Sequence, residues 1–183
     1  MSIFRKSASF DKADITQVKG QDDREKSGPL QIGNDSKAMA ERLSAERERV
    51  VSGGNSCCVA VCMPDPMQGM SVEQAVAETA RRFANSLRAY DSIFLRPGNR
   101  ILVCAPFVKS GDAPGLMERL RDLASRMPVT LSDGTSGHVM VSVGGVMMDR
   151  SANVEETIRR ADKAMEQGKL SGNRMCLWSP DLL

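Results

Sequence analysis

The sequence lacks an excess of charge of either sign. Its 183 residues include 25 lysines and arginines against 23 aspartates and glutamates, for a formal net charge of +2. Without a strong field of one sign, composition gives no reason to expect a nucleic-acid polymer as a partner. Long apolar runs are also missing. The longest, Cys57 to Met63, has seven residues, whereas a helix that spans a bilayer needs about 20, so no membrane span is expected.

Patterns for metal binding and secretion are missing as well. The basic pair near the start is not followed by an apolar run, so no secretory signal is expected. Cys58-x-x-x-Cys62 has no second cysteine pair beside it, and the one histidine, His138, is isolated, which argues against a zinc site. We therefore expect no metal and no other cofactor. The five cysteines are expected to be reduced and mostly buried, in a cytoplasmic protein.

The chain divides into a tail, a leading helix and one domain. Residues 1–35 are polar and show no sustained period, so they are expected to form a disordered tail. Residues 36–55 begin with a stretch rich in Ala, Glu and Arg whose apolar residues have helical spacing, which predicts a leading helix and a linker. Residues 56–183 are numerous enough for a single domain with its own core.

Within this domain, short apolar segments alternate with amphipathic ones. Residues 57–63 read as a buried strand. Ser71-x-x-Gln74 is a capping box that opens a helix with apolar residues every three to four positions as far as Tyr90. Residues 92–106 are typical of a hairpin around a Pro-Gly-Asn turn. The remaining predicted elements are a helix over 116–127, a hairpin over 129–147, a helix over 154–167 and an edge strand over 175–178. This order predicts an α+β (mixed α/β) fold, with a single, mostly antiparallel central sheet flanked by helices.

Three segments, taken in order, resemble the GGDEF (diguanylate cyclase) family. They are the helix that leads to Arg88 and Asp91, the strand Val141-Ser-Val-Gly-Gly-Val146, and the segment from Ala161 to Arg174. The last is similar to the family's closing A-D-x-A-L-Y-x-A-K-x-x-G-R-N. The resemblance covers residues 57–175 and implies the palm-like fold of the nucleotidyl cyclases.

The resemblance fails at positions that carry the chemistry of the family. There, an aspartate at the end of the first strand and an acidic residue in the signature turn hold two divalent cations. Here Met63 stands at the first position, and Asn99 and Arg100 stand in the turn. Such cations need hard oxygen ligands, and a guanidinium repels them, since two unit charges about 4 Å apart interact by about 4 kcal/mol at an intermediate dielectric. The sequence therefore predicts a degenerate domain that is not an enzyme.

A ligand-binding pattern of the family is retained. Many members bind their product, cyclic di-GMP, at an inhibitory site with an R-x-x-D motif five residues before the signature turn, often with a second arginine on the next helix. Arg88, Asp91 and Arg119 stand at the matching positions. A guanidinium can bind guanine or phosphate through two hydrogen bonds, and a carboxylate accepts from guanine N–H groups. The same spacing occurs twice more in the chain, where it is typical of a helical ion pair.

The resemblance implies a catalytically inactive receptor or regulatory adaptor that binds cyclic di-GMP through these three residues. A protein partner or a second copy of the chain is expected in addition. One alternative is a pseudo-enzyme scaffold that binds no nucleotide and docks a protein partner through its tail and leading helix. Another is residual GTP binding, because Glu73 and Lys169 stand where the family has a guanine-contacting and a phosphate-contacting residue.

Overall fold

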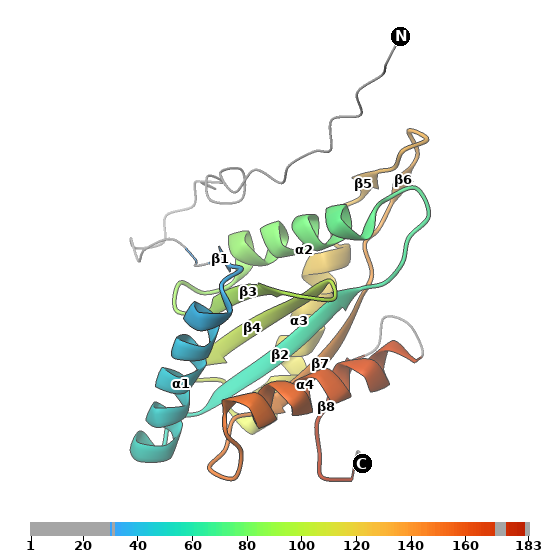
Figure 1. Ribbon diagram of the computed structural model, residues 1–183. Helices are drawn as coiled ribbons and strands as arrows, with labels where there is room; N and C mark the ends of the chain where they lie inside the picture. The colour runs from blue at the N-terminus through green and yellow to red at the C-terminus, as the bar shows by residue number, and fades with distance from the viewer. Residues whose placement is uncertain (1–29, 31, 171–174, 182–183) are drawn as a thin grey trace.

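A six-stranded sheet forms the centre of the computed structural model, which describes residues 30, 32–170 and 175–181 (Figure 1). Its order is β1-β3-β4-β2-β7-β8. The strands are β1 (Ile32–Gly33), β2 (Cys57–Pro64), β3 (Ser92–Arg96), β4 (Arg100–Pro106), β7 (Val141–Met147) and β8 (Met175–Leu177). The four inner strands pair antiparallel, while β1 and β8 lie parallel to their neighbours at the two edges. The mostly antiparallel sheet expected from the sequence is confirmed.

In the described part of the chain, four α-helices flank this sheet, and three of them begin at a side chain that caps a free backbone N–H group. The helices are α1 (Ser36–Gly53), α2 (Val72–Ser86), α3 (Ala113–Ser125) and α4 (Val154–Lys169), with a short 3-10 helix η1 (Ser110–Asp112) before α3. Asp35 caps α1, Ser71 and Gln74 form a reciprocal capping box on α2, and Asn153 caps α4. Within the described residues, no helix has the length and apolar character needed to cross a bilayer.

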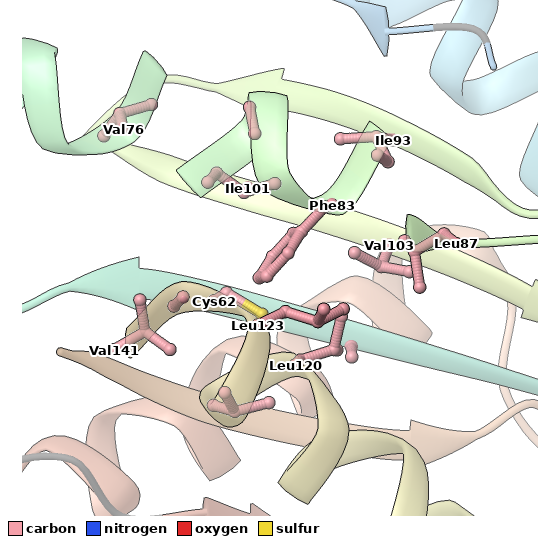
Figure 2. Packing of buried hydrophobic residues seen from close by; sticks show 14 of the residues in the cluster. Cys62, Val76, Phe83, Leu87, Ile93, Ile101, Val103, Leu120, Leu123 and Val141 are labelled. Carbon is pink, nitrogen blue, oxygen red and sulfur yellow. The ribbon is translucent and has the colours of Figure 1, made fainter. Parts of the chain in front are cut away.

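The helices cover both faces of the sheet, so the core has two layers. Helices α2 and α3 pack on one face, where Phe83 is fully buried among residues of β2, β3, β4 and β7 (Figure 2). Helices α1 and α4 pack on the other face, through Leu43, Ala161 and Met165. Successive residues of β2 alternate between the two layers, as the pleat of a strand requires. All five cysteines are free, and four of them are buried.

Three segments differ from the sequence-based prediction. Ile32 and Gly33 belong to the predicted disordered tail, yet they form the edge strand β1 beside β3; residues 1–29 and 31 lie outside the described part of the chain. Helix α2 ends at Ser86 instead of continuing to Tyr90. The predicted second hairpin is split, since β5 (Val129–Thr130) and β6 (Ser136–Gly137) form a small separate sheet and β7 joins the main one.

Candidate functional site

The turn between β3 and β4 adopts the left-handed backbone conformation that its residues favour. Gly98 has a φ of 77° and Asn99 a φ of 60°, values that glycine and asparagine tolerate best. The flanking residues Arg96 and Arg100 face each other across the hairpin. Cys62 of β2 is the partner of Ile101, so the end of β2 lies beside the start of β4. The predicted hairpin is confirmed, and it brings the signature turn next to the end of β2.

Both arginines of this hairpin are paired with carboxylates of α4. Arg96 Nη1 donates to both oxygens of Asp162, at 3.0 and 3.1 Å. Arg100 Nη2 donates to Glu166 Oε1 at 2.8 Å, and its Nη1 lies 3.7 Å from Asp162 Oδ1. The Arg96 and Asp162 side chains are only 17% and 19% exposed. The positive charge of Arg100 is therefore met by α4 and does not stand uncompensated at the turn.

The end of β2 was expected to lack a cation ligand because Met63 occupies the relevant position. Met63 is the penultimate residue of β2 and is half-buried. Asp65 follows the strand, and its Oδ1 accepts a hydrogen bond from Ser142 Oγ at 3.0 Å. Across the described ranges, no three side chains of His, Cys, Asp or Glu form a group that could hold a metal ion.

Arg88 and Asp91 lie in the turn between α2 and β3, not on a helix. Asp91 N donates to Arg88 O at 2.9 Å, and Arg88 N donates to Asp91 Oδ2 at 2.9 Å. These two bonds close the turn. Neither is an ion pair between side chains, and none joins Arg88 to Asp91 within the described structure. Arg88 and Asp91 are therefore joined through the backbone of the turn and not as a helical ion pair.

The carboxylate of Asp91 is buried beneath a group of arginines. Asp91 is 4% exposed, whereas the Arg88 and Arg119 residues are exposed. Burial raises the pKa of Asp91 above its usual value, while the Arg88 amide and the charges of Arg88, Arg119 and Arg42 act against that rise. Asp91 Oδ1 has no hydrogen-bond partner in the described structure. The fold thus brings all three residues of the sequence-predicted site together, with the acid inside and two arginines outside.

Helices α1 and α3 contribute the arginines that surround this turn. Arg119 of α3 donates through Nη2 to the carbonyl oxygen of Ser86, the last residue of α2. Arg42 of α1 donates through Nη2 to Tyr90 O at 2.8 Å and pairs with the buried Glu46 at 2.9 Å. The sequence analysis missed Arg42, because only the docking of α1 against the domain brings it to the turn.

The chain is similar in structure to several solved GGDEF domains. The GGDEF domain of TpbB (YfiN) from Pseudomonas aeruginosa is 19% identical, with a TM-score of 0.72 over 82% of this chain and 92% of that one. The GGDEF domain of DgcB from Caulobacter crescentus, solved with c-di-GMP, is 20% identical, with a TM-score of 0.71 over 87% and 98%. SiaD from Pseudomonas aeruginosa, a diguanylate cyclase solved with its activator SiaC, is 25% identical, with a TM-score of 0.67 over 77% of this chain and 57% of that one. No curated protein sequence matches significantly.

The prediction that the chain is not an enzyme is wrong. The sequence model that matches residues 70–175, more than half of the chain, is described as "Diguanylate cyclase, GGDEF domain". The similar structures include the active GGEEF domain of a diguanylate cyclase from Vibrio cholerae. One physical ground for the prediction also fails, because Asp162 and Glu166 meet the charge of Arg100. Sequence and fold agree, and the chain belongs to the GGDEF domain family, a family of enzymes.

Proposed function

We propose that this GGDEF domain is a receptor for cyclic di-GMP, which it binds at the turn of Arg88 and Asp91 together with Arg119. The observation that supports this most is the placement of two exposed guanidinium groups around one buried carboxylate. The solved DgcB domain, which has the same fold, contains c-di-GMP. Occupancy of the site would serve as a regulatory signal in the cytoplasm, where five free thiols remain reduced.

The ligand offers groups that suit this arrangement. Cyclic di-GMP carries two phosphates and two guanines, and each guanine presents O6 and N7 acceptors on one edge and N–H donors on another. A guanidinium has five N–H donors in a planar fork. Arg119 uses one side of its fork for Ser86 O, so further donors remain for a phosphate or a base. Exposed Arg88 is free to turn toward the ligand because its side chain makes no ion pair in the described structure.

Asp91 has two roles in this proposal. Its Oδ2 holds the Arg88 amide and so fixes the turn. Its Oδ1 lacks a partner, and a buried acceptor without a hydrogen bond is unfavourable. A guanine N–H group is a donor that would satisfy it once the turn opens, because this oxygen is closed to solvent in the free domain. Ligand binding would then complete the hydrogen bonding that the free domain leaves open.

Calorimetric titration of the full chain with cyclic di-GMP tests the proposal. We expect binding in the wild type and a loss of roughly tenfold or more in affinity for Arg88→Ala and for Arg119→Ala, since each removes hydrogen bonds to charged groups worth roughly 1.5–3 kcal/mol. Arg126→Ala is the matched control. It removes an exposed arginine at the end of the same helix as Arg119 and should leave the affinity unchanged.

Other results would point to the alternatives. A wild type that takes up no cyclic di-GMP would refute the receptor proposal. If the same protein then bound GTP, residual nucleotide binding would be favoured. If it bound neither nucleotide, a protein-docking scaffold would be favoured instead. If the wild type binds cyclic di-GMP and Arg88→Ala and Arg119→Ala bind it equally tightly, the ligand of the proposal stands but this site is refuted.

A further inference from the structure

Two aromatic side chains stand exposed and in contact beside the Arg88 turn. Tyr90 is 44% exposed and Phe107 is 54% exposed. Their ring centroids lie 5.7 Å apart at an interplanar angle of 83°, an edge-to-face arrangement. Tyr90 belongs to the turn itself, and Phe107 directly follows β4. Large aromatic side chains usually bury most of their surface, so this pair leaves apolar, planar surface open to a ligand.

Phe107 adopts an unfavourable backbone conformation, which a backbone hydrogen bond helps to maintain. Its φ is 63°, in the left-handed region where a bulky side chain is a true outlier. Phe107 N donates to Ser56 O at 2.7 Å, which ties this backbone to the start of β2. Strained residues of this kind gather at binding and active sites, where the surrounding structure maintains them. The fold thus keeps an exposed phenylalanine where glycine or asparagine would fit with less strain.

Charged groups border the aromatic pair. The Cζ atom of Arg88 lies 5.8 Å from the centroid of the Tyr90 ring. Arg42 donates to the carbonyl oxygen of the same tyrosine at 2.8 Å. The next residue is Asp91, which is 4% exposed and has an unpartnered Oδ1. A planar apolar face, positive charge and an unfilled acceptor therefore lie together. Their combined chemistry matches a purine nucleotide whose base carries N–H donors.

We propose that Tyr90 and Phe107 form an aromatic surface for one guanine base of the ligand, which would lie flat on one ring and against the edge of the other because the two rings are nearly perpendicular. This inference rests on the proposed function and adds two residues to its site. A base stacks on aromatic rings through its π face, whichever hydrogen bonds its edges make. The rings would hold the base while Arg88 and Asp91 reach its edge or the adjoining phosphate. An adenine base would stack equally well but presents a different edge, so the carboxylate would supply the preference for guanine.

Paired substitutions separate stacking from mere apolar bulk. Phe107→Tyr and Tyr90→Phe keep a ring, whereas Phe107→Leu and Tyr90→Leu keep apolar volume but lose the π face. In calorimetric titration with cyclic di-GMP, we expect the ring-keeping variants to match the wild type. The leucine variants should bind about tenfold more weakly, within the range for one stacked base. Both Phe107 variants keep a bulky side chain at a φ of 63°, so their thermal unfolding midpoints should agree.

The single tyrosine of the chain gives a second readout. Tyr90 is the one tyrosine and Trp178 the one tryptophan among all 183 residues. In a Trp178→Phe variant, tyrosine emission therefore reports on Tyr90 alone. We expect cyclic di-GMP to quench this emission with the same midpoint as the calorimetric titration. Free tyrosine amide titrated in parallel corrects for light absorbed by the ligand.

The possible failures are distinguishable. If the wild type binds cyclic di-GMP and Arg88→Ala weakens it, while both leucine variants bind normally, the aromatic surface is refuted and the receptor proposal stands. Unchanged Tyr90 emission on saturation would refute the aromatic surface in the same way. If the wild type shows no binding heat and no quenching, both proposals fall together.

Discussion

Gly144 should be the least replaceable glycine of the central sheet. It lies in β7 beneath α4, and a Cβ atom built there would lie 2.0 Å from Met165 N, 2.4 Å from Ala161 O and 2.5 Å from Met165 Cα. All three are backbone atoms of the helix and cannot rotate aside. Since non-bonded carbon contacts settle near 3.5–4 Å, α4 would have to move away by roughly 1.5 Å. Gly144→Ala should therefore destabilise the domain.

The expected cost lies at the upper end of the range for overpacked cores, about 3 kcal/mol. For a domain of this size, that corresponds to a fall of about 6–12 °C in the thermal unfolding midpoint. Calorimetry or circular dichroism would measure it. Two matched glycines serve as controls. Gly145 would meet the flexible Met117 side chain at 2.5 Å and should cost less, whereas Gly115 in α3 has nothing within 4 Å.

Gly115→Ala should raise stability by about 0.5–1 kcal/mol, because alanine is the better helix former. Gly144→Ala and Gly115→Ala should therefore change the free energy of unfolding in opposite directions, although the substitution is the same. A Gly144→Ala variant as stable as the wild type would refute the close packing of α4 on β7. It would also put in doubt the placement of Asp162, which the same turn of α4 carries to the hairpin arginines.

Three further changes test the caps and the charges. Ser71→Ala removes the capping box of α2 and should cost about 1 kcal/mol, visible as a lower urea midpoint; no change would refute the cap. Asp162→Asn breaks the pair with Arg96 and the contact with Arg100 and should cost roughly 1.5–3 kcal/mol, whereas equal stability would mean that these contacts are fully screened. Arginine hydrogen bonds lower the pKa of Glu156 from 4.5 to about 2. Its contribution to stability is present above pH 4.5 and is lost as the pH falls toward 2. Glu156→Gln should therefore make the free energy of unfolding depend less on pH in this range. An unchanged pH dependence would contradict the pairing of Glu156 with the arginines.

Much of the fold could be predicted from local patterns. The capping box at Ser71 predicts the start of α2, and the Pro-Gly-Asn turn predicts the β3–β4 hairpin. The end of α2 could not be predicted, because helical spacing continues to Tyr90 in the sequence. In the structure, Leu87 turns into the core, and the Asp91 carboxylate takes the Arg88 amide. The end of α2 is therefore set by the Asp91 side chain, which competes for the backbone N–H group of Arg88. This competition depends on where the turn lies in the folded domain.

The residues of the candidate site could be foreseen only in part, and their binding of a ligand stays a prediction. The register of Arg88 and Asp91 with the hairpin was readable in the sequence, and the family resemblance added Arg119. The sequence could not show that Arg100 pairs with Glu166, because 66 positions separate them. The sequence analysis considered the turn without its distant partners on α4, and it therefore overstated how strongly the turn repels cations. The positions of Arg42 and Phe107 beside this turn could not be predicted, because they depend on the docking of α1 and on the backbone geometry after β4.

Two arginines of helix α1 donate hydrogen bonds to two loops that are far apart in the sequence. Arg42 holds the carbonyl of Tyr90, and Arg47, little more than one turn further along, holds the carbonyls of Ala152 and Arg150 just before α4. A shift of α1 by one helical turn would break the hydrogen bonds of Arg42 and of Arg47 together. A force on α1 would therefore weaken the contacts at Tyr90 and those just before α4 together. By reciprocity, a molecule that strengthens the contacts at Tyr90 would make α1 harder to pull away.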